Sequence, residues 1–223
     1  MNWSPLILTF QLAIISTLVL LLIGIPIASG LAHANKKFKP FLEAIVSLPL
    51  VLPPTVIGFY LLIAFSPNSI LGRAVASIFG IQLAFSFTGL VIGSVIYSLP
   101  FMVQPIHSGL ISLGSSLKEA SLILGKSRWQ TLINVTLPNI KPALLSGIIL
   151  SFAHTIGEFG IVLMIGGNIP DQTRVASIAI YDHVEALNYG EAHTLSIILI
   201  SITFITLVAT YLINGQFLKR TGA

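Results

Sequence analysis

The chain has 223 residues, of which 55% are hydrophobic and only 8% are charged, whereas a soluble domain carries about 25% charged residues. With a mean hydropathy of +0.97, this composition excludes a water-soluble globule and predicts an all-α polytopic membrane protein that forms a single domain over residues 1–223. The net charge of +4 is interpreted as a sign of membrane topology rather than of nucleic-acid binding. The absence of cysteine excludes disulfides, thiolate nucleophiles and cysteine-bound metals.

Five apolar stretches are long enough to cross a lipid bilayer, which requires about 20 apolar residues per helix. We place the transmembrane helices, in chain order, at 6–32, 42–65, 85–110, 142–165 and 193–217. The charge-free region 74–117 is long enough for two helices, so six spans are the alternative. A sixth span would put the basic loop that follows on the wrong side of the membrane, and we therefore predict five.

The basic residues fall mainly on one side of this five-span arrangement. Nine of the 11 lie in the first loop, the third loop and the tail: Lys36, Lys37, Lys39, Lys118, Lys126, Arg128, Lys141, Lys219 and Arg220. Only Arg73 and Arg174 lie on the other side. Because basic loops stay in the cytoplasm, the N-terminus is expected outside the cell membrane and the C-terminus inside. The first stretch is interpreted as a retained span, since its basic flank follows it rather than precedes it.

The second span contains three prolines, Pro49, Pro53 and Pro54. Prolines this dense break a helix and free backbone groups that hydrocarbon cannot satisfy, so the break should face protein or a water-filled cavity. Broken helices in transporters often present backbone N–H groups to anions. Pro53, Pro54 and Thr55 are therefore candidates for the translocation pathway, and a simple packed kink is the alternative.

The loop 112–141 contains signals for two short helices outside the membrane. Two S-x-x-[EQ] capping boxes mark their starts: Ser116 with Glu119, and Ser127 with Gln130. Gly125 supplies a residue tolerant of positive φ between them, and Pro138 is expected to end the second helix. Several apolar residues in this hairpin cannot all be buried within it: Leu122, Leu124, Trp129 and Ile133. The loop is therefore either a docking element for another protein or a plain connector.

The order of residues in this loop resembles a signature of the permease subunits of binding-protein-dependent ABC importers, written EAA-x3-G-x9-I-x-LP. The matching residues are Glu119, Ala120, Ser121, Gly125, Val135, Leu137 and Pro138. Ser121 and Val135 are conservative departures, and the spacing is matched over 20 residues. The resemblance implies a cytoplasmic coupling loop that engages ATPase subunits. It also implies a homodimer of this chain with two such subunits, and an extracytoplasmic oxyanion-binding protein as a further partner.

A tripeptide inside the loop imitates a nucleotide-binding motif. Gly125, Lys126 and Ser127 read like the end of a P-loop, but G-x-x-x-x-G-K-[ST] requires glycine where this chain has Ala120. ATP hydrolysis is therefore expected on a separate subunit. We expect the chain itself to have no enzymatic activity, no catalytic residue and no cofactor.

Further segments are similar to the permeases of molybdate importers, with sulfate and thiosulfate permeases as the next relatives. They cover residues 41–65, 151–159 and 166–181, and the similarity extends over most of the chain. The resemblance implies import of molybdate. Tungstate is not distinguished, because the two tetrahedral dianions have the same charge and nearly the same size, and sulfate or thiosulfate remains the alternative.

Glu158 is the only acidic residue deep in a span, and an intramembrane carboxylate is by default a functional candidate. A bare carboxylate would repel a dianion. We therefore expect Glu158 to be hydrogen-bonded, protonated or paired with a basic group, and to hold helices or a gate together. His154, four residues earlier, is the expected neighbour. Two ligands are too few for a metal site, and none is predicted.

Two other classes of protein are weighed against the permease. A secondary transporter should show an inverted repeat and several mid-membrane carboxylates, and an intramembrane enzyme needs a nucleophile with a base or a carboxylate pair. We find no repeat and one carboxylate. The lack of Lys or Arg within the spans fits a weak anion path lined by hydroxyls such as Ser94, Ser98 and Thr155.

Overall fold

The computed structural model describes residues 2–114 and 116–220, apart from the side chains of residue 210 and of those beyond residue 212. Every regular element among these residues is a helix, as predicted. The elements up to the third loop are α1 (Ser4–His33), α2 (Lys39–Val51), α3 (Pro54–Phe65), α4 (Ile70–Phe79) and α5 (Phe87–Ser112). The later ones are α6 (Ser116–Ile123), α7 (Arg128–Thr131), the π-helix η1 (Leu132–Thr136), α8 (Leu137–Asn139), α9 (Lys141–Ile156), α10 (Gly160–Gly166), α11 (Ala176–Glu185) and α12 (Tyr189–Arg220).

Three helices, α1, α5 and α12, are long and apolar enough to cross a membrane as single elements. Two bent pairs raise the number to five: α2 meets α3 at 105°, and the segment Arg128–Asn139 meets α9 at 78°. Helix α4 is apolar but has 10 residues, which give only about 15 Å of helix. The part of the chain that the structure describes thus agrees with five spans rather than six.

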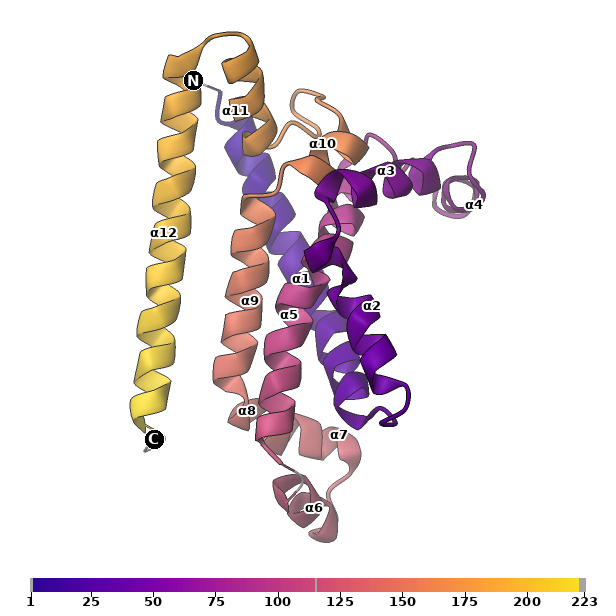
Figure 1. Cartoon of the computed structure of the whole chain (residues 1–223), viewed down its shortest axis with the longest axis vertical. Coiled ribbons are helices and arrows are strands. Elements are labelled where there is room, and N and C mark those ends of the chain that lie inside the picture. Colours follow the sequence, from indigo (N-terminus) through magenta and orange to yellow (C-terminus); the bar gives the residue numbers. More distant parts are fainter. Residues whose placement is uncertain (1, 115, 221–223) are drawn as a thin grey trace.

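The long helices run along one axis of the molecule, and successive passes alternate in direction (Figure 1). The N-terminus and α11 lie at one end, with α3, α4 and α10 nearby; we call this the N-terminal end. The hairpin of α6, α7, η1 and α8, the turn between α1 and α2, and the C-terminus lie at the other, which we call the hairpin end. The hairpin end is therefore the one that carries the basic loops.

The centre of the bundle is formed by α1, α5 and α9, which pack against one another. One apolar cluster includes Leu12, Leu90 and Ile165, and a second, nearer the hairpin end, includes Leu20 and Met102. Among the described residues, α12 packs mainly against α9 and α11 and leaves most of its apolar side chains exposed. In a protein whose exposed surface meets lipid, such a face needs no protein partner.

The fourth predicted span, 142–165, is not one continuous helix. Helix α9 ends at Ile156, and α10 begins at Gly160 after a three-residue break. The break is tolerated because its freed backbone groups find partners within the protein: the Ser177 hydroxyl donates to the Glu158 carbonyl at 2.6 Å. Residues 157–159 contain no proline, so the sequence pattern predicts a continuous span here.

The segment after α10 forms an amphipathic helix, α11. Val175, Ile178 and Ala179 are buried, whereas Glu185 is exposed and Asp182 half-exposed. The amide of Ala176 donates to the buried Thr9 hydroxyl of α1 at 2.8 Å. Helix α11 is therefore held against the bundle by its apolar face and by one buried hydrogen bond.

We expect Gly109→Val to destabilise the bundle, because a Cβ at Gly109 would lie 2.6 Å from the Cβ of Ala143 in α9. An alanine Cβ cannot move aside, so α5 and α9 must separate, at a cost of about 1–3 kcal/mol. Gly30→Val is the matched control, since a Cβ there meets no atom within 4 Å. The thermal midpoint in detergent should fall for Gly109→Val alone, and equal midpoints for the two variants would contradict the packing described.

Candidate coupling loop and translocation pathway

The first helix of the hairpin, α6, ends at Ile123, and the chain then turns at Gly125 as predicted. This glycine has φ of +79°, a left-handed conformation that glycine adopts without a steric penalty. Its amide bonds to the Leu122 carbonyl at 2.9 Å, and the next amide, of Lys126, reaches the Ser121 carbonyl at 3.2 Å. These two bonds satisfy carbonyls that the end of α6 would otherwise leave free.

The second helix begins with the capping box expected from Ser127 and Gln130. The Ser127 hydroxyl accepts from the Gln130 amide at 3.2 Å, and the Gln130 side chain accepts from the Ser127 amide at 2.9 Å. The capping role predicted for Ser116 is wrong: α6 begins at Ser116 itself, which is thus its first helical residue rather than the residue before it. Position 115 lies outside the described residues.

Pro138 does not end the second helix, contrary to the prediction. The chain changes at Leu132 from α-helix to a five-residue π-helix and then continues through Pro138 to Asn139. Proline is tolerated here because it falls in the first turn of a new helical segment, where its missing N–H is least needed. The Asn139 side chain donates to the Val135 carbonyl at 2.7 Å. The π-helix thus lets the chain remain helical up to α9.

A buried hydrogen bond joins the two halves of the hairpin. The hydroxyls of Ser121 in α6 and Thr131 in α7 lie 3.0 Å apart, and both side chains are buried. This contact requires a small residue at position 121, the third position of the signature. The other signature residues are placed differently: Glu119, Ala120, Gly125 and Pro138 are exposed, and Val135 and Leu137 are half-buried.

Large apolar side chains remain exposed on this ordered hairpin. Ile123, Leu124 and Trp129 are 85%, 80% and 68% exposed. An open groove of about 670 Å³ runs between the hairpin and the end of α1, and its lining includes Trp129 and His33. Because helix ends, caps and a buried hydrogen bond fix the hairpin while its apolar residues lie uncovered, the geometry favours a docking element over a plain connector.

The predicted pathway residues Pro53, Pro54 and Thr55 lie where α2 and α3 meet at 105°. Pro53 is the residue before α3, and Thr55 is exposed in its first turn. Pro54 packs against the first residue of α10, since a Cβ on Gly160 would lie 2.7 Å from the Cβ of Pro54. The structure therefore brings together the break in the second span and the break in the fourth.

Glu158 lies in the second of these breaks, but its side chain does not face an open space. It is only 5% exposed, and neither carboxylate oxygen has a hydrogen bond of normal geometry within the described residues. The neighbouring polar side chain is Ser94 of α5. The predicted neighbour His154 turns away: its Nδ1 lies 3.0 Å from the Ser98 hydroxyl, and its ring stacks on Phe101 at 4.0 Å.

The three hydroxyls suggested for an anion path are buried between α5 and α9. Ser98 lies 3.2 Å from the Thr155 hydroxyl, which itself donates to the Ser151 carbonyl at 2.9 Å. Ser94 is fully buried. In this arrangement Ser98 and Thr155 join two helices, which is the common role of hydroxyl residues in membrane helices.

A polar pair between α2 and α5 was not predicted from the sequence. The Gln104 side chain of α5 donates to the Ser47 hydroxyl of α2 at 3.1 Å, and Gln104 is exposed. The available signal was an amide within an otherwise apolar span.

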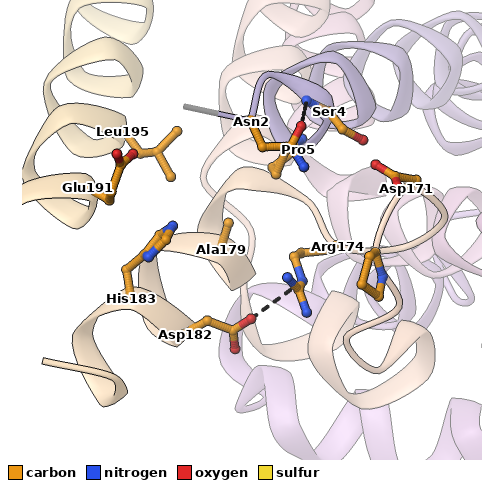
Figure 2. A pocket seen from close by; sticks show the side chains of 11 residues that line it. Asn2, Ser4, Pro5, Asp171, Arg174, Ala179, Asp182, His183, Glu191 and Leu195 are labelled. Carbon is orange, nitrogen blue, oxygen red and sulfur yellow. Dashed lines mark hydrogen bonds and ion pairs between the residues drawn. The ribbon is translucent and has the colours of Figure 1, made fainter. Parts of the chain in front are cut away.

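At the N-terminal end, Arg174 is not a free cation. Figure 2 shows it directed at Asp182, with 3.4 Å between its Nε and the nearer carboxylate oxygen, beside a pocket of about 160 Å³. The Asn168 side chain accepts from Arg174 and donates to Asp182. Nearby, the hydrogen bond from Tyr181 to Glu185 raises the pKa of the Tyr181 hydroxyl. This network ties the turn after α10 to α11.

A bundle of up to five membrane passes, in which the breaks before α3 and before α10 lie together and an ordered hairpin stands at the basic end, has the features of a transporter permease. Residues 20–222 match the family described as "Binding-protein-dependent transport system inner membrane component". The chain belongs to this family. It is an inner-membrane permease component, and the family consists of permeases rather than enzymes.

Curated relatives cover nearly the whole chain. The "Molybdenum transport system permease protein ModB" of Azotobacter vinelandii is 45% identical over 92% of this chain and 90% of its own length. The protein of that name from Escherichia coli is 34% identical over 99% of this chain and 97% of its own length. The E. coli "Sulfate transport system permease protein CysT" is 32% identical over 82% of this chain and 65% of its own length.

Solved structures agree on the fold. An inward-facing structure of the MetNI methionine ABC transporter matches with a TM-score of 0.72 at 18% identity, covering 95% of this chain and 94% of that one. A bacterial alginate ABC transporter in complex with a periplasmic protein matches with a TM-score of 0.70 at 18% identity, covering 96% of this chain and 79% of that one. At this identity, the likeness establishes the fold alone.

We expect Ser127→Ala to loosen the hairpin by removing the first bond of the capping box, a loss of about 1 kcal/mol. Local opening would then be about fivefold more frequent, and trypsin should cut at Lys126 and Arg128 correspondingly faster. Ser116→Ala is the control, because Ser116 does not cap α6. Mass spectrometry of timed digests would measure both rates, and equal rates in both variants would show that the box does not order the hairpin.

Proposed function

We propose that this chain is the transmembrane permease subunit of an ABC importer that moves molybdate, and equally tungstate, into the cytoplasm. Membership of the permease family supports the transport class, and the relatives named for molybdenum transport support the substrate. The observation that carries the proposal is the ordered hairpin: its signature residues stand on two fixed helices, and its apolar residues Ile123, Leu124 and Trp129 are uncovered.

The partner that fits this hairpin is a cytoplasmic ABC ATPase subunit. Two copies of the chain would present two hairpins to two ATPase subunits, and an extracytoplasmic oxyanion-binding protein would deliver the anion at the N-terminal end. In this proposal ATP binding brings the ATPase pair together, the docked hairpins move with it, and the spans open outward. Hydrolysis then returns them to the inward-open state.

The hairpin end is assigned to the cytoplasm by the distribution of basic residues. Nine of the 11 Lys and Arg residues belong to the loops and tail of that end, so the N-terminus would lie outside and the C-terminus inside. The ordered hairpin faces the same compartment as the ATPase it would bind. Topology and docking thus depend on the same assignment.

The pathway is proposed to pass the level where the two broken spans meet. Pro53, Pro54 and Thr55 begin α3 there, and Thr55 is exposed. Glu158 occupies the adjacent break, but burial between helices suits it for a structural or gating role rather than for contact with a dianion. Sulfate is the second candidate substrate, because sulfate permeases are also related, with a smaller share of their length covered.

We predict that Glu119→Lys abolishes molybdate uptake and stimulation of the partner ATPase, because it reverses the charge of an exposed signature residue without changing any buried contact. Glu119→Gln is the conservative control and should retain a measurable share of both activities. Reconstituted vesicles containing the full transporter would provide both readouts. Uptake that persists when the partner ATPase is inactivated would reject the ABC mechanism in favour of a secondary transporter.

The substrate assignment predicts a ranking in competition experiments. Excess tungstate should suppress uptake of labelled molybdate, because the two dianions match in charge and size, whereas an equal excess of sulfate should leave most uptake intact. The assay needs the binding protein in excess so that competition reports on the whole system. Stronger suppression by sulfate than by tungstate would transfer the assignment to sulfate.

A further inference from the structure

One face of α5 changes from aromatic to polar toward the hairpin end. Tyr97, Phe101, Gln104 and Ser108 follow one another at spacings of four, three and four residues, which places them on a single helix face. Gln104 and Ser108 are exposed although both belong to a membrane-spanning helix. An amide facing hydrocarbon loses hydrogen bonds that water would supply, so this face is unsuited to contact with lipid.

Helix α2 borders this face without covering it. None of the side chains of α2 is buried, and its polar contact here is the bond of 3.1 Å from Gln104 to the Ser47 hydroxyl. The pair satisfies one N–H of the Gln104 amide. The Gln104 oxygen, the second N–H and the Ser108 hydroxyl thus lie beside an exposed surface rather than within a packed core.

The surface is hollowed into a groove of about 350 Å³ between α2, α5 and α9. Its lining includes Leu50, Phe101, Gln104, Ser108 and Leu150. Since a water molecule occupies about 30 Å³ of liquid, the groove is large enough for a tetrahedral oxyanion together with part of its hydration shell. It lies in the half of the span that leads to the hairpin end, because α5 runs on from Ser108 to its end at Ser112.

Toward the N-terminal end the groove meets a packed cluster. The ring of Phe101 stacks on His154 at 4.0 Å, and His154 is also held by the Ser98 hydroxyl at 3.0 Å. The Tyr97 ring also lies beside the imidazole, with ring centroids 4.9 Å apart. Packed side chains of α5 and α9 therefore lie at the Phe101 edge of the groove, whereas Gln104 and Ser108 beyond them are exposed.

We propose that this groove is the inner half of the oxyanion path, with Gln104 and Ser108 as its hydrogen-bond donors and with Phe101 stacked on His154 as its seal. The inference rests on the proposed function. It assigns the path to residues that lie between the breaks in the two spans and the hairpin end. Uncharged donors suit this position, because a groove lined by Lys or Arg would hold a dianion too tightly to release it. The alternative occupant, a second copy of the chain covering the groove, is an outcome of the test.

The absence of native cysteine makes the proposal directly testable by single-cysteine labelling. Gln104→Cys and Ser108→Cys would be prepared in the full transporter with its ATPase partner, in membranes, and treated with an anionic methanethiosulfonate reagent. Ile200→Cys in α12 and Leu22→Cys in α1 are controls, since these apolar residues are 67% and 75% exposed but belong to faces that suit lipid. Labelling would be followed without nucleotide and in the vanadate-trapped state.

We expect both groove positions to react at least about tenfold faster than both controls in one of the two states, and millimolar molybdate to slow that reaction. Labelling as slow as at the controls in both states would overturn the proposal. So would a disulfide between the two copies at position 104 without labelling, which would place the groove in the interface between copies. Labelling that no oxyanion slows would overturn it as well.

The same experiment separates this inference from the substrate assignment. Protection by sulfate and not by molybdate would uphold the groove while rejecting molybdate as the cargo. A second variant, Gln104→Glu, keeps the shape of the side chain but adds a negative charge. It should lower oxyanion uptake at least tenfold while ATPase stimulation persists. The uncharged control is Gln104→Asn, and equal uptake by the two variants would overturn the assignment of Gln104 to the path.

Discussion

The fold depends on one constraint, which is that a backbone within a bilayer must satisfy its own hydrogen bonds. Continuous helices meet it over most of α1, α5 and α12, although Pro26 in α1 and Pro100 and Pro105 in α5 each lack the N–H of one helical hydrogen bond. The two interruptions meet it through protein contacts: the Ser177 hydroxyl covers the Glu158 carbonyl, and Pro54 lies directly against Gly160. The breaks before α3 and before α10 thus lie at one level of the molecule, where other helices surround them. This level separates the N-terminal end from the groove on α5.

Outside the bilayer the order of the hairpin has a different origin. Its helices are too short to be stable alone, and they bury few apolar side chains. Their geometry comes from Gly125 at the turn, from the capping box at Ser127 and from the hydroxyl pair of Ser121 and Thr131. Local hydrogen bonds therefore hold an apolar surface in place before any partner covers it, which reduces the ordering entropy lost on docking.

Much of this architecture was predictable from the sequence, because hydropathy and positive charge act over long segments. The five passes, the amphipathic helix after α10 and the turn at Gly125 follow from residue patterns alone. The break before α10 was not predicted, since residues 157–159 contain no proline and the Ser177 hydroxyl that bonds to the Glu158 carbonyl comes from a separate helix. The environment of Glu158 was missed for the same reason: sequence spacing put His154 beside it, whereas packing on Phe101 turns the imidazole toward α5.

The residues proposed for coupling follow from their spacing, but their environments differ in ways that spacing does not reveal. Ser121 is a buried contact between helices, whereas Glu119 and Ala120 are exposed. Pro138 was expected to stop a helix because the rule for prolines assumes α-helical geometry on both sides. The preceding π-helix removes that assumption.

The π-helix also sets an angular offset between the hairpin and the membrane. A π turn contains one residue more than an α turn, and each residue of an α-helix rotates the chain by about 100°. The five residues Leu132–Thr136 therefore determine the azimuth at which α9 leaves the hairpin. An equivalent α-helical linker, one residue shorter, would present a different side of α9 to α5, and it would also shorten the spacing between Gly125 and Leu137 in the signature. Insertions and deletions in this linker are thus constrained by rotation as well as by length.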